Sequence, residues 1–132
     1  MKYTINTDGG ARGNPGPAAI GITLRSESGE IILKHKEKIG DATNNVAEYK
    51  ALIKGLELAL QNGAEDIVCV LDSELVVKQV NGLYRVKEDT LKILHAEVKT
   101  LLSKFKNFLV KHVKRKDNSD ADKLVNEALD NE

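Results

Sequence analysis

A long amphipathic segment followed by a short apolar run constrains the fold of this chain more than any other feature. Apolar residues repeat at helical spacing from Tyr49 to Leu60, between the helix-start signal Thr43–Asn45 and the stop signal Asn62–Gly63. The run Asp66–Leu71 then has the composition of a strand that is buried on both faces. Because strand-like segments precede this helix, the order predicts a parallel crossover and an α/β domain with a mixed sheet.

The other segments complete this prediction. Alternating apolar residues predict an antiparallel meander of three strands over Met1–Thr7, Ala18–Arg25 and Ile31–Ile39. Later segments predict a short helix, a helical stripe, a last strand and a helix capped by Ser119, over 73–80, 91–105, 108–113 and 119–129. We therefore expect a five-stranded mixed sheet, three antiparallel strands and then two parallel ones, flanked by helices. A chain of 132 residues suits a single domain over residues 1–132.

The stretch Ile5–Gly21 carries an acid, Asp8, from an apolar strand into a turn rich in glycine, asparagine and proline. The glycines, Gly9 and Gly10 among them, permit positive φ and let another backbone approach, whereas the prolines fix φ. An acid at a strand end beside such a turn fits a metal ligand that faces a polyanion. For this stretch alone, a hairpin turn with an incidental acid is an equally good explanation.

Four acids lie at the ends of predicted strands or helices, beside the crevice expected where the strands end. These acids are Asp8, Glu48, Asp72 and Asp122. Carboxylates a few ångströms apart repel one another, so a converging set is either partly protonated or holds cations. Oxygen ligands favour Mg²⁺ or Mn²⁺ over zinc, and two such ions would activate a water for displacement at a phosphodiester. Glu48 and Asp122 taken singly are explained as well by charges at helix ends.

Charge, cysteine content and hydropathy narrow the remaining function classes. The 20 basic side chains balance the 20 acidic ones, which neither favours nor excludes nucleic acid, because phosphate attraction depends on a local basic patch. Cys69 is the single cysteine and is expected to be a buried apolar residue. No signal segment or run near the ~20 apolar residues of a membrane span occurs, so we expect a cytoplasmic protein without membrane association. No obligate protein partner is evident.

Four motifs in order resemble those of ribonuclease H of type 1, and the resemblance runs from end to end. They are TDGGARGNPGP with Asp8, TNNVAEYKAL with Glu48, LDSELVVKQVNG with Asp72 and DNSDADKLVNEALD with Asp122. The chain is most similar to the compact archaeal and bacterial subset, in which DSELVV is followed by G-x-Y-x-V-K, here Gly82–Lys87. The resemblance implies a ribonuclease H-like fold and cleavage of the RNA strand of RNA/DNA hybrids, leaving 3′-hydroxyl and 5′-phosphate ends. It also implies that the four acids hold two Mg²⁺ or Mn²⁺ ions.

The resemblance further assigns substrate contacts at matching positions. Asn14, Thr43 and Asn44 match a pocket for a phosphate of the DNA strand, although Thr43 and Asn44 are explained as well by helix capping. Both explanations can hold, because an exposed helix N-terminus is itself an anion site. Asn45 matches a minor-groove contact, and Glu48 is expected near the ribose 2′-hydroxyl. Further expected substrate-binding positions are Gly9 and Gly10, which would admit the RNA strand, and Ser73.

The chain departs from its larger relatives in two places. Those relatives often carry a basic, Trp-bearing protrusion, whereas this chain has no Trp and passes from Lys87 to a helix at Thr90. A cluster of basic residues near the last strand is the expected replacement, although a solvated charge run explains most of them as well: Lys104, Lys106, Lys111, Lys114, Arg115 and Lys116. A loop histidine before the last acid is also missing. We expect Arg115, in the H-V-x-R position of the compact subset, to contact the scissile phosphate in preference to His112.

Two alternatives stay open at this point. A non-catalytic nucleic-acid-binding module with the same fold would fit the pattern, although such modules usually lose at least one acid and none is missing here. The missing protrusion also leaves cleavage of double-stranded RNA open as an added activity.

Overall fold

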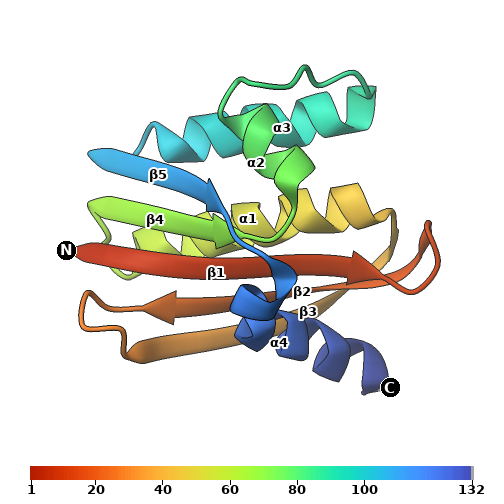
Figure 1. The fold of residues 1–132 in the computed structure, drawn as a ribbon, viewed down its shortest axis with the longest axis horizontal. Helices are drawn as coiled ribbons and strands as arrows, with labels where there is room; N and C mark the ends of the chain where they lie inside the picture. The colour runs from red at the N-terminus through yellow and green to blue at the C-terminus, as the bar shows by residue number, and fades with distance from the viewer. Residues whose placement is uncertain (132) are drawn as a thin grey trace.

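The computed structural model describes residues 1–131 as one five-stranded sheet with helices on both of its faces (Figure 1). The strands are β1 (Lys2–Ala11), β2 (Gly16–Arg25), β3 (Ile31–Ala42), β4 (Asp66–Leu71) and β5 (Asn107–His112). Their order across the sheet is β3-β2-β1-β4-β5. The β1/β2 and β2/β3 pairs are antiparallel, whereas the β1/β4 and β4/β5 pairs are parallel, so the predicted mixed sheet is confirmed.

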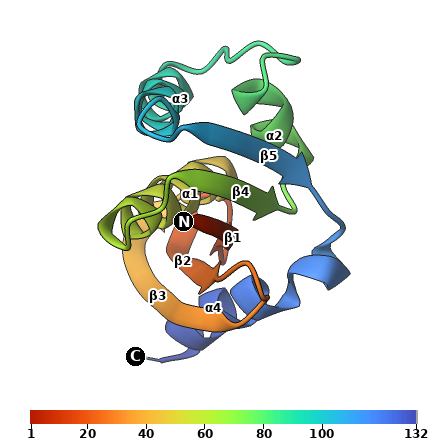
Figure 2. The same ribbon diagram turned by 90° about the vertical axis from the view of Figure 1, so that its left-hand side faces the viewer.

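The helices are α1 (Asn44–Gln61), α2 (Glu74–Val80), α3 (Asp89–Leu102) and α4 (Ser119–Asp130), with a 3₁₀ turn η1 (Arg115–Asn118) before α4. Helix α1 packs on β1 and β2, with α3 beside it, and α4 covers β1, β2 and β3 from the other face (Figure 2). The core between α1 and the sheet includes Ile5, Leu52, Leu56 and Cys69, all fully buried. Within residues 1–131, none of the helices combines the length and apolarity that crossing a bilayer requires.

Strand β1 is longer than the sequence predicts, because its pairing with β2 continues to Ala11 opposite Ala18. Asp8 therefore lies inside the strand and not after its end, and the expected glycine turn shrinks to the connection 12–15. Of the glycines in this stretch, only Gly13 has a positive φ, at 95°. The expected strand end at Thr7 is thus wrong, and the reason is that backbone pairing overrides the turn preference of glycine.

The start of α4 also differs from the prediction. Ser119 is the first residue of the helix and not its cap, and Asn118 occupies the N-cap position without making a side-chain cap bond. The Asn118 side chain is instead used elsewhere: its Nδ2 donates to the Thr7 carbonyl oxygen at 2.9 Å, and its Oδ1 accepts from Asn6 Nδ2 at 3.1 Å. These bonds to β1 fix the start of α4 against the centre of the sheet.

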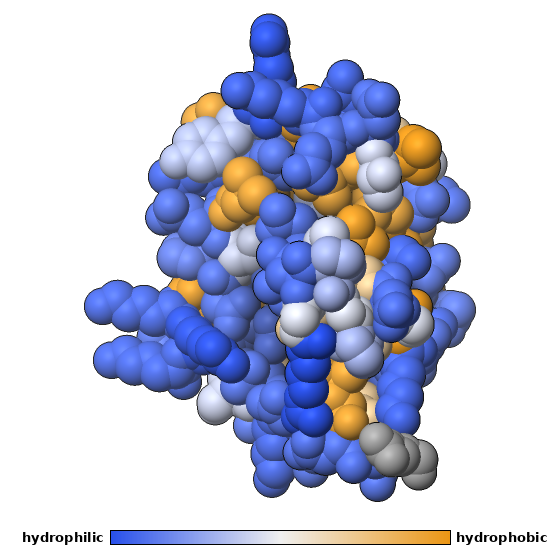
Figure 3. Space-filling model, turned by 90° about the vertical axis from the view of Figure 1, so that its right-hand side faces the viewer, coloured by the Kyte–Doolittle hydropathy of each residue, from blue (hydrophilic) through white to orange (hydrophobic). Residues whose placement is uncertain are grey.

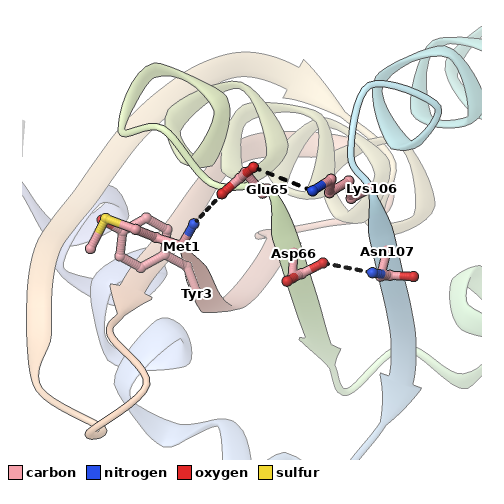
Figure 4. A network of polar contacts seen from close by, with 6 residues as sticks. All are labelled: Met1, Tyr3, Glu65, Asp66, Lys106 and Asn107. Carbon is pink, nitrogen blue, oxygen red and sulfur yellow. Dashed lines mark hydrogen bonds and ion pairs between the residues drawn. The ribbon is translucent and has the colours of Figure 1, made fainter.

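A polar network joins the amino ends of the three parallel strands (Figure 4). The Met1 amino group donates to Glu65 Oε1 at 2.9 Å, and Lys106 Nζ lies 3.9 Å from Glu65 Oε2. Beside it, Asn107 Nδ2 donates to Asp66 Oδ1 at 2.9 Å. These groups lie at the opposite end of β4 from Asp72, which follows the carboxyl end of that strand.

Candidate active site

The strand register brings two of the four acids together. The parallel pairing of β1 with β4 ends at Thr7 opposite Leu71, and in both cases the next residue of the chain is an acid: Asp8 within β1 and Asp72 immediately after β4. Asp8 pairs with Gly21 of β2. A Cβ at Gly21 would meet Ala121 of α4, and facing residues of an antiparallel pair share a face, so Asp8 points to the side that α4 covers.

Helix α1 carries the third acid, Glu48, and packs closely against Gly9 of β1. A side-chain carbon at position 9 would lie 2.1 Å from the Ala47 carbonyl oxygen, so the lack of a side chain lets the backbone of α1 rest on β1. The Gly9 amide then donates a hydrogen bond to Glu48 Oε1. Gly9 thus admits the backbone of the protein's own helix α1, and its expected contact with the RNA strand stays a prediction.

Three carboxylates converge and the fourth lies beside them. Asp8, Glu48 and Asp72 each offer an oxygen, and these oxygens lie within 4.8 Å of one another. The side chains of Asp8 and Glu48 are buried, and that of Asp72 is partly buried. Asp122 stands in the first turn of α4, where its Oδ1 accepts from Arg115 Nη2 at 3.1 Å. Burial is the main cause of the raised pKa of Asp8 and of Glu48, and the charge of Asp122 adds to it.

Burial and the charges of neighbouring acids raise the pKa values of the three central acids. Burial first, and then the charges of Glu48 and Asp72, raise the pKa of Asp8 to about 10. Burial raises the pKa of Glu48 to about 7, against hydrogen bonds from Asp8 and Gly9 that lower it. Burial also raises the pKa of Asp72. A set of oxygen ligands that shares protons in this way fits a divalent cation, which would replace the protons and neutralise the repulsion.

The acids line an open groove of about 460 Å³. Several predicted substrate-binding residues share its wall: Gly9, Gly10, Asn44, Asn45 and Ser73. Ser73 also caps α2, where its Oγ accepts from the Val76 amide at 3.3 Å. The face that carries the β1–β2 connection is largely hydrophilic, with smaller apolar areas between the polar side chains (Figure 3).

The three residues of the predicted phosphate pocket meet at the start of α1. Thr43 caps the helix, its Oγ1 accepting from the Val46 amide at 3.2 Å. The Asn44 amide donates to Asn14 Oδ1 at 3.0 Å, and Asn44 Oδ1 accepts from the Ala11 amide at 2.9 Å. The capping explanation therefore holds for Thr43, whereas the Asn44 side chain connects α1 to β1.

Arg115 is the one member of the predicted basic cluster found in the groove wall among residues 1–131; Lys104, Lys106, Lys111, Lys114 and Lys116 lie outside it. Its side chain is 76% exposed. His112 is exposed on β5 and does not line the groove. The geometry thus brings Arg115, and not His112, to the acids.

Sequence reasoning missed two residues of the site. Asn118 is buried, and its side chain lowers the pKa of Asp72, against the larger effect of burial. Its position just before Ser119 is the only sequence signal, and that signal is equally typical of a helix cap. Arg12 lines the groove from the β1–β2 connection and pairs with Asp130 at the far end of α4. No local pattern connects residues so far apart in the chain.

Comparisons with known proteins agree with this geometry. A family model described as reverse transcriptase-like matches residues 6–128. The chain is 46% identical to a ribonuclease HI of Halobacterium salinarum over 93% of its length, and 42% identical to a bifunctional protein of Mycobacterium tuberculosis over 98%. It spans 62% of the length of the first relative and 36% of the second.

Solved structures agree over the whole chain. The RNase H1 of Halobacterium salinarum superposes with a TM-score of 0.98 at 42% identity, and the match covers 100% of both chains. LC11-RNase H1, isolated from compost and solved in complex with an RNA/DNA hybrid, has a TM-score of 0.92 at 44% identity, covering 97% of this chain and 96% of that one. These matches show that the chain belongs to the ribonuclease H type 1 family.

Proposed function

We propose that this chain is a divalent-metal-dependent endoribonuclease that hydrolyses the RNA strand of RNA/DNA hybrids. The observation that carries the proposal is the convergence of Asp8, Glu48 and Asp72, whose oxygens lie within 4.8 Å of one another in an open groove. The similarity to LC11-RNase H1, a structure that contains an RNA/DNA hybrid, supports the choice of substrate.

The acids would hold two Mg²⁺ or Mn²⁺ ions, with Asp122 completing the ligand set of Asp8, Glu48 and Asp72. When bound, such ions activate a water and neutralise charge on the leaving oxygen, which would leave 3′-hydroxyl and 5′-phosphate ends. The Gly9 amide keeps Glu48 turned toward the cluster, and Asn118 holds the start of α4 against β1. These contacts set the positions of the ligands before substrate binds.

The polar groups around the acids would position the two strands. The side chain of Asn14 uses its Oδ1 to accept from Asn44, so its Nδ2 can donate to a phosphate of the DNA strand beside Thr43. Asn45 would reach the minor groove, and Arg115 would contact the scissile phosphate. Gly10 and Ser73 would lie close to the RNA strand, where a small side chain or none lets the backbone approach.

Cleavage assays with three substrates test the proposal. Labelled RNA/DNA hybrid, double-stranded RNA and DNA are compared at one salt concentration, each with Mg²⁺, with Mn²⁺ and with EDTA, because phosphate-driven affinity varies steeply with salt. We expect metal-dependent cleavage of the hybrid, and cleavage of double-stranded RNA would add the second activity. Equal cleavage with EDTA, or none with either metal, would contradict the proposal and favour a non-catalytic binding module.

Asp72→Asn should lower the cleavage rate by several orders of magnitude while the fold persists, because the loss of one ligand dismantles a metal site. Asp66→Asn is the matched control, since Asp66 lies at the other end of the same strand and bonds to Asn107.

We propose in addition that residues 1–132 act as one catalytic domain, and that the protein is cytoplasmic. Both proposals rest on the sequence alone.

A further inference from the structure

Two ion pairs connect the groove to the two ends of α4. Among residues 1–131, the groove wall contains two basic side chains, Arg115 and Arg12. Arg115 Nη2 lies 3.1 Å from Asp122 Oδ1, and Arg12 Nη2 lies 2.5 Å from Asp130 Oδ1. The function proposed above uses the first pair and leaves the second without a role.

The Arg12–Asp130 pair adds little to the stability of the fold. The two side chains are 50% and 68% exposed, and exposed pairs of this kind contribute little because water and salt screen their charges. Asp130 is also the last residue of α4, where the helix dipole disfavours a negative charge. Neither the exposure of the pair nor its place at the end of α4 therefore gives it a stabilising role.

The backbone of Arg12 is fixed although its side chain is exposed. Its amide donates to the Pro17 carbonyl oxygen at 2.8 Å, which closes the β1–β2 connection immediately after the paired residue Ala11. Arg12 thus lines, from an anchored backbone, a wall shared with Asp8 and Asp122, and its guanidinium pairs with Asp130 beside that wall. A carboxylate and a phosphate offer the same pair of oxygens to a guanidinium, so Asp130 occupies the place that a phosphate would take.

The two arginines are too far apart to bind one phosphate. Their partners Asp122 and Asp130 stand in the first and last turns of α4, about 12 Å apart along the helix axis. That separation corresponds to a few nucleotides of one strand. A strand that runs along α4 with its reacting phosphate near Arg115 would bring another phosphate near Arg12.

We propose that Arg12 binds a backbone phosphate of the strand being cut, a few nucleotides from the reacting phosphate, and that Asp130 masks it until nucleic acid displaces the carboxylate. The proposal rests on the proposed function, because it takes the hybrid as the ligand of this groove. It makes Arg12 a substrate-binding residue and Asp130 a competitor of the substrate.

The masking role and a structural role predict opposite effects for the acid. If Asp130 masks Arg12, Asp130→Asn frees the guanidinium and strengthens hybrid binding. If the pair only holds α4 to the β1–β2 connection, Asp130→Asn and Arg12→Gln both leave affinity unchanged or weaken it. Arg25 and Asp120 form a second ion pair between β2 and α4, with side chains that are 28% and 53% exposed, and this pair does not line the groove. Arg25→Gln and Asp120→Asn are therefore controls with the same changes in charge.

Binding is measured by fluorescence anisotropy with a labelled RNA/DNA hybrid at several salt concentrations, in an Asp72→Asn background that prevents cleavage. Arg12→Gln is expected to weaken binding about tenfold and to reduce the slope of log Kd against log salt by about 0.7 to 0.9, the effect of one lost phosphate contact. Asp130→Asn is expected to tighten binding severalfold more than Asp120→Asn does. Thermal unfolding of each variant checks that α4 stays in place.

Three results would overturn the inference. The first is a salt slope for Arg12→Gln equal to that of Arg25→Gln, and the second is no gain for Asp130→Asn over Asp120→Asn. In either case, cleavage of the hybrid by the unmodified protein would show that the proposed function stands and that Arg12 alone was misassigned. The third is an unmodified protein that neither binds nor cleaves the hybrid, which would overturn both proposals together.

Discussion

Gly21 lies opposite Asp8 in the antiparallel pairing of β1 and β2, and its missing side chain leaves the space that the backbone of α4 occupies. A side-chain carbon at position 21 would lie 2.5 Å from the Ala121 carbonyl oxygen and 2.8 Å from Leu124 Cβ. Because Asp122 follows Ala121 directly, the contact at Gly21 sets how closely the fourth acid approaches Asp8.

Gly21→Ala should therefore damage both stability and activity. The added carbon meets backbone and not a flexible side chain, so α4 has to move, at a cost of about 1 to 3 kcal/mol. Urea unfolding measures the loss, and hybrid cleavage should fall because Asp122 moves with α4. Gly10→Ala is the stability control, since its new carbon would meet only Val125 Cγ1, at an ordinary 3.6 Å. Equal stability of the two variants would contradict the argument.

The free energy of unfolding of the metal-free protein should fall as the pH rises. Burial raises the pKa of Glu48 to about 7 from an ordinary 4.5, and burial and neighbouring charges raise that of Asp8 to about 10 from 3.8. The folded state thus binds protons more tightly than the unfolded state. The resulting stabilisation is complete below the ordinary values and is lost as the pH rises through 7 toward 10.

Urea unfolding in EDTA from about pH 5 to about pH 9 measures this loss. Asp8→Asn should flatten the profile and make the metal-free protein more stable than the unmodified one at high pH, because it removes one of the repelling charges. Saturating Mg²⁺ should restore stability to the unmodified protein at high pH and do much less for the variant. Identical stability profiles for the two proteins would show that Asp8 does not contribute to the pH dependence of stability.

Asn118→Ala should cost about 1 to 3 kcal/mol of stability, because it leaves the buried Thr7 carbonyl oxygen without its donor. The cleavage rate should fall as well, since η1 and the first turn of α4 lose their attachment to β1. Asn107→Ala provides the comparison, because its bond to Asp66 is exposed and should be worth less than ~1 kcal/mol. Chemical denaturation and single-turnover cleavage measure the two effects.

Arg115→Ala should lower the single-turnover cleavage rate by roughly 10²-fold, if its guanidinium stabilises charge at the scissile phosphate. His112→Ala should leave the rate within a factor of about two, because His112 lies outside the groove wall. The reverse order of effects would transfer the role to His112.

The sequence predicts most of the fold because local pattern and tertiary structure agree. The strand Asp66–Leu71 and the helix cap at Thr43 have the predicted positions, since an apolar run or a capping hydroxyl is decided by its own neighbours. The predicted end of β1 is wrong because a glycine run is typical of a turn, whereas pairing with β2 keeps Gly9 and Gly10 extended.

The site is predictable only in part for a related reason. Asp8 and Asp72 meet because two strands end their pairing side by side, which the crossover pattern indicates. The position of Glu48 depends on the contact of Gly9 with Ala47, and the contacts of Asn118 and Arg12 reach across more than a hundred residues. Such contacts follow from packing and leave no periodic signal in the chain.

The pairing of β1 with β4 has a consequence for how the protein gains its activity during folding. Two strands, β2 and β3, and the whole of α1 lie between these partners along the chain, so the pairing closes a long loop. Loop-closure entropy makes such pairings slow to form compared with local hairpins and helices. In a refolding experiment, the helical circular dichroism signal should return before metal-dependent cleavage does. The delay between the two signals measures how much later β4 joins the sheet.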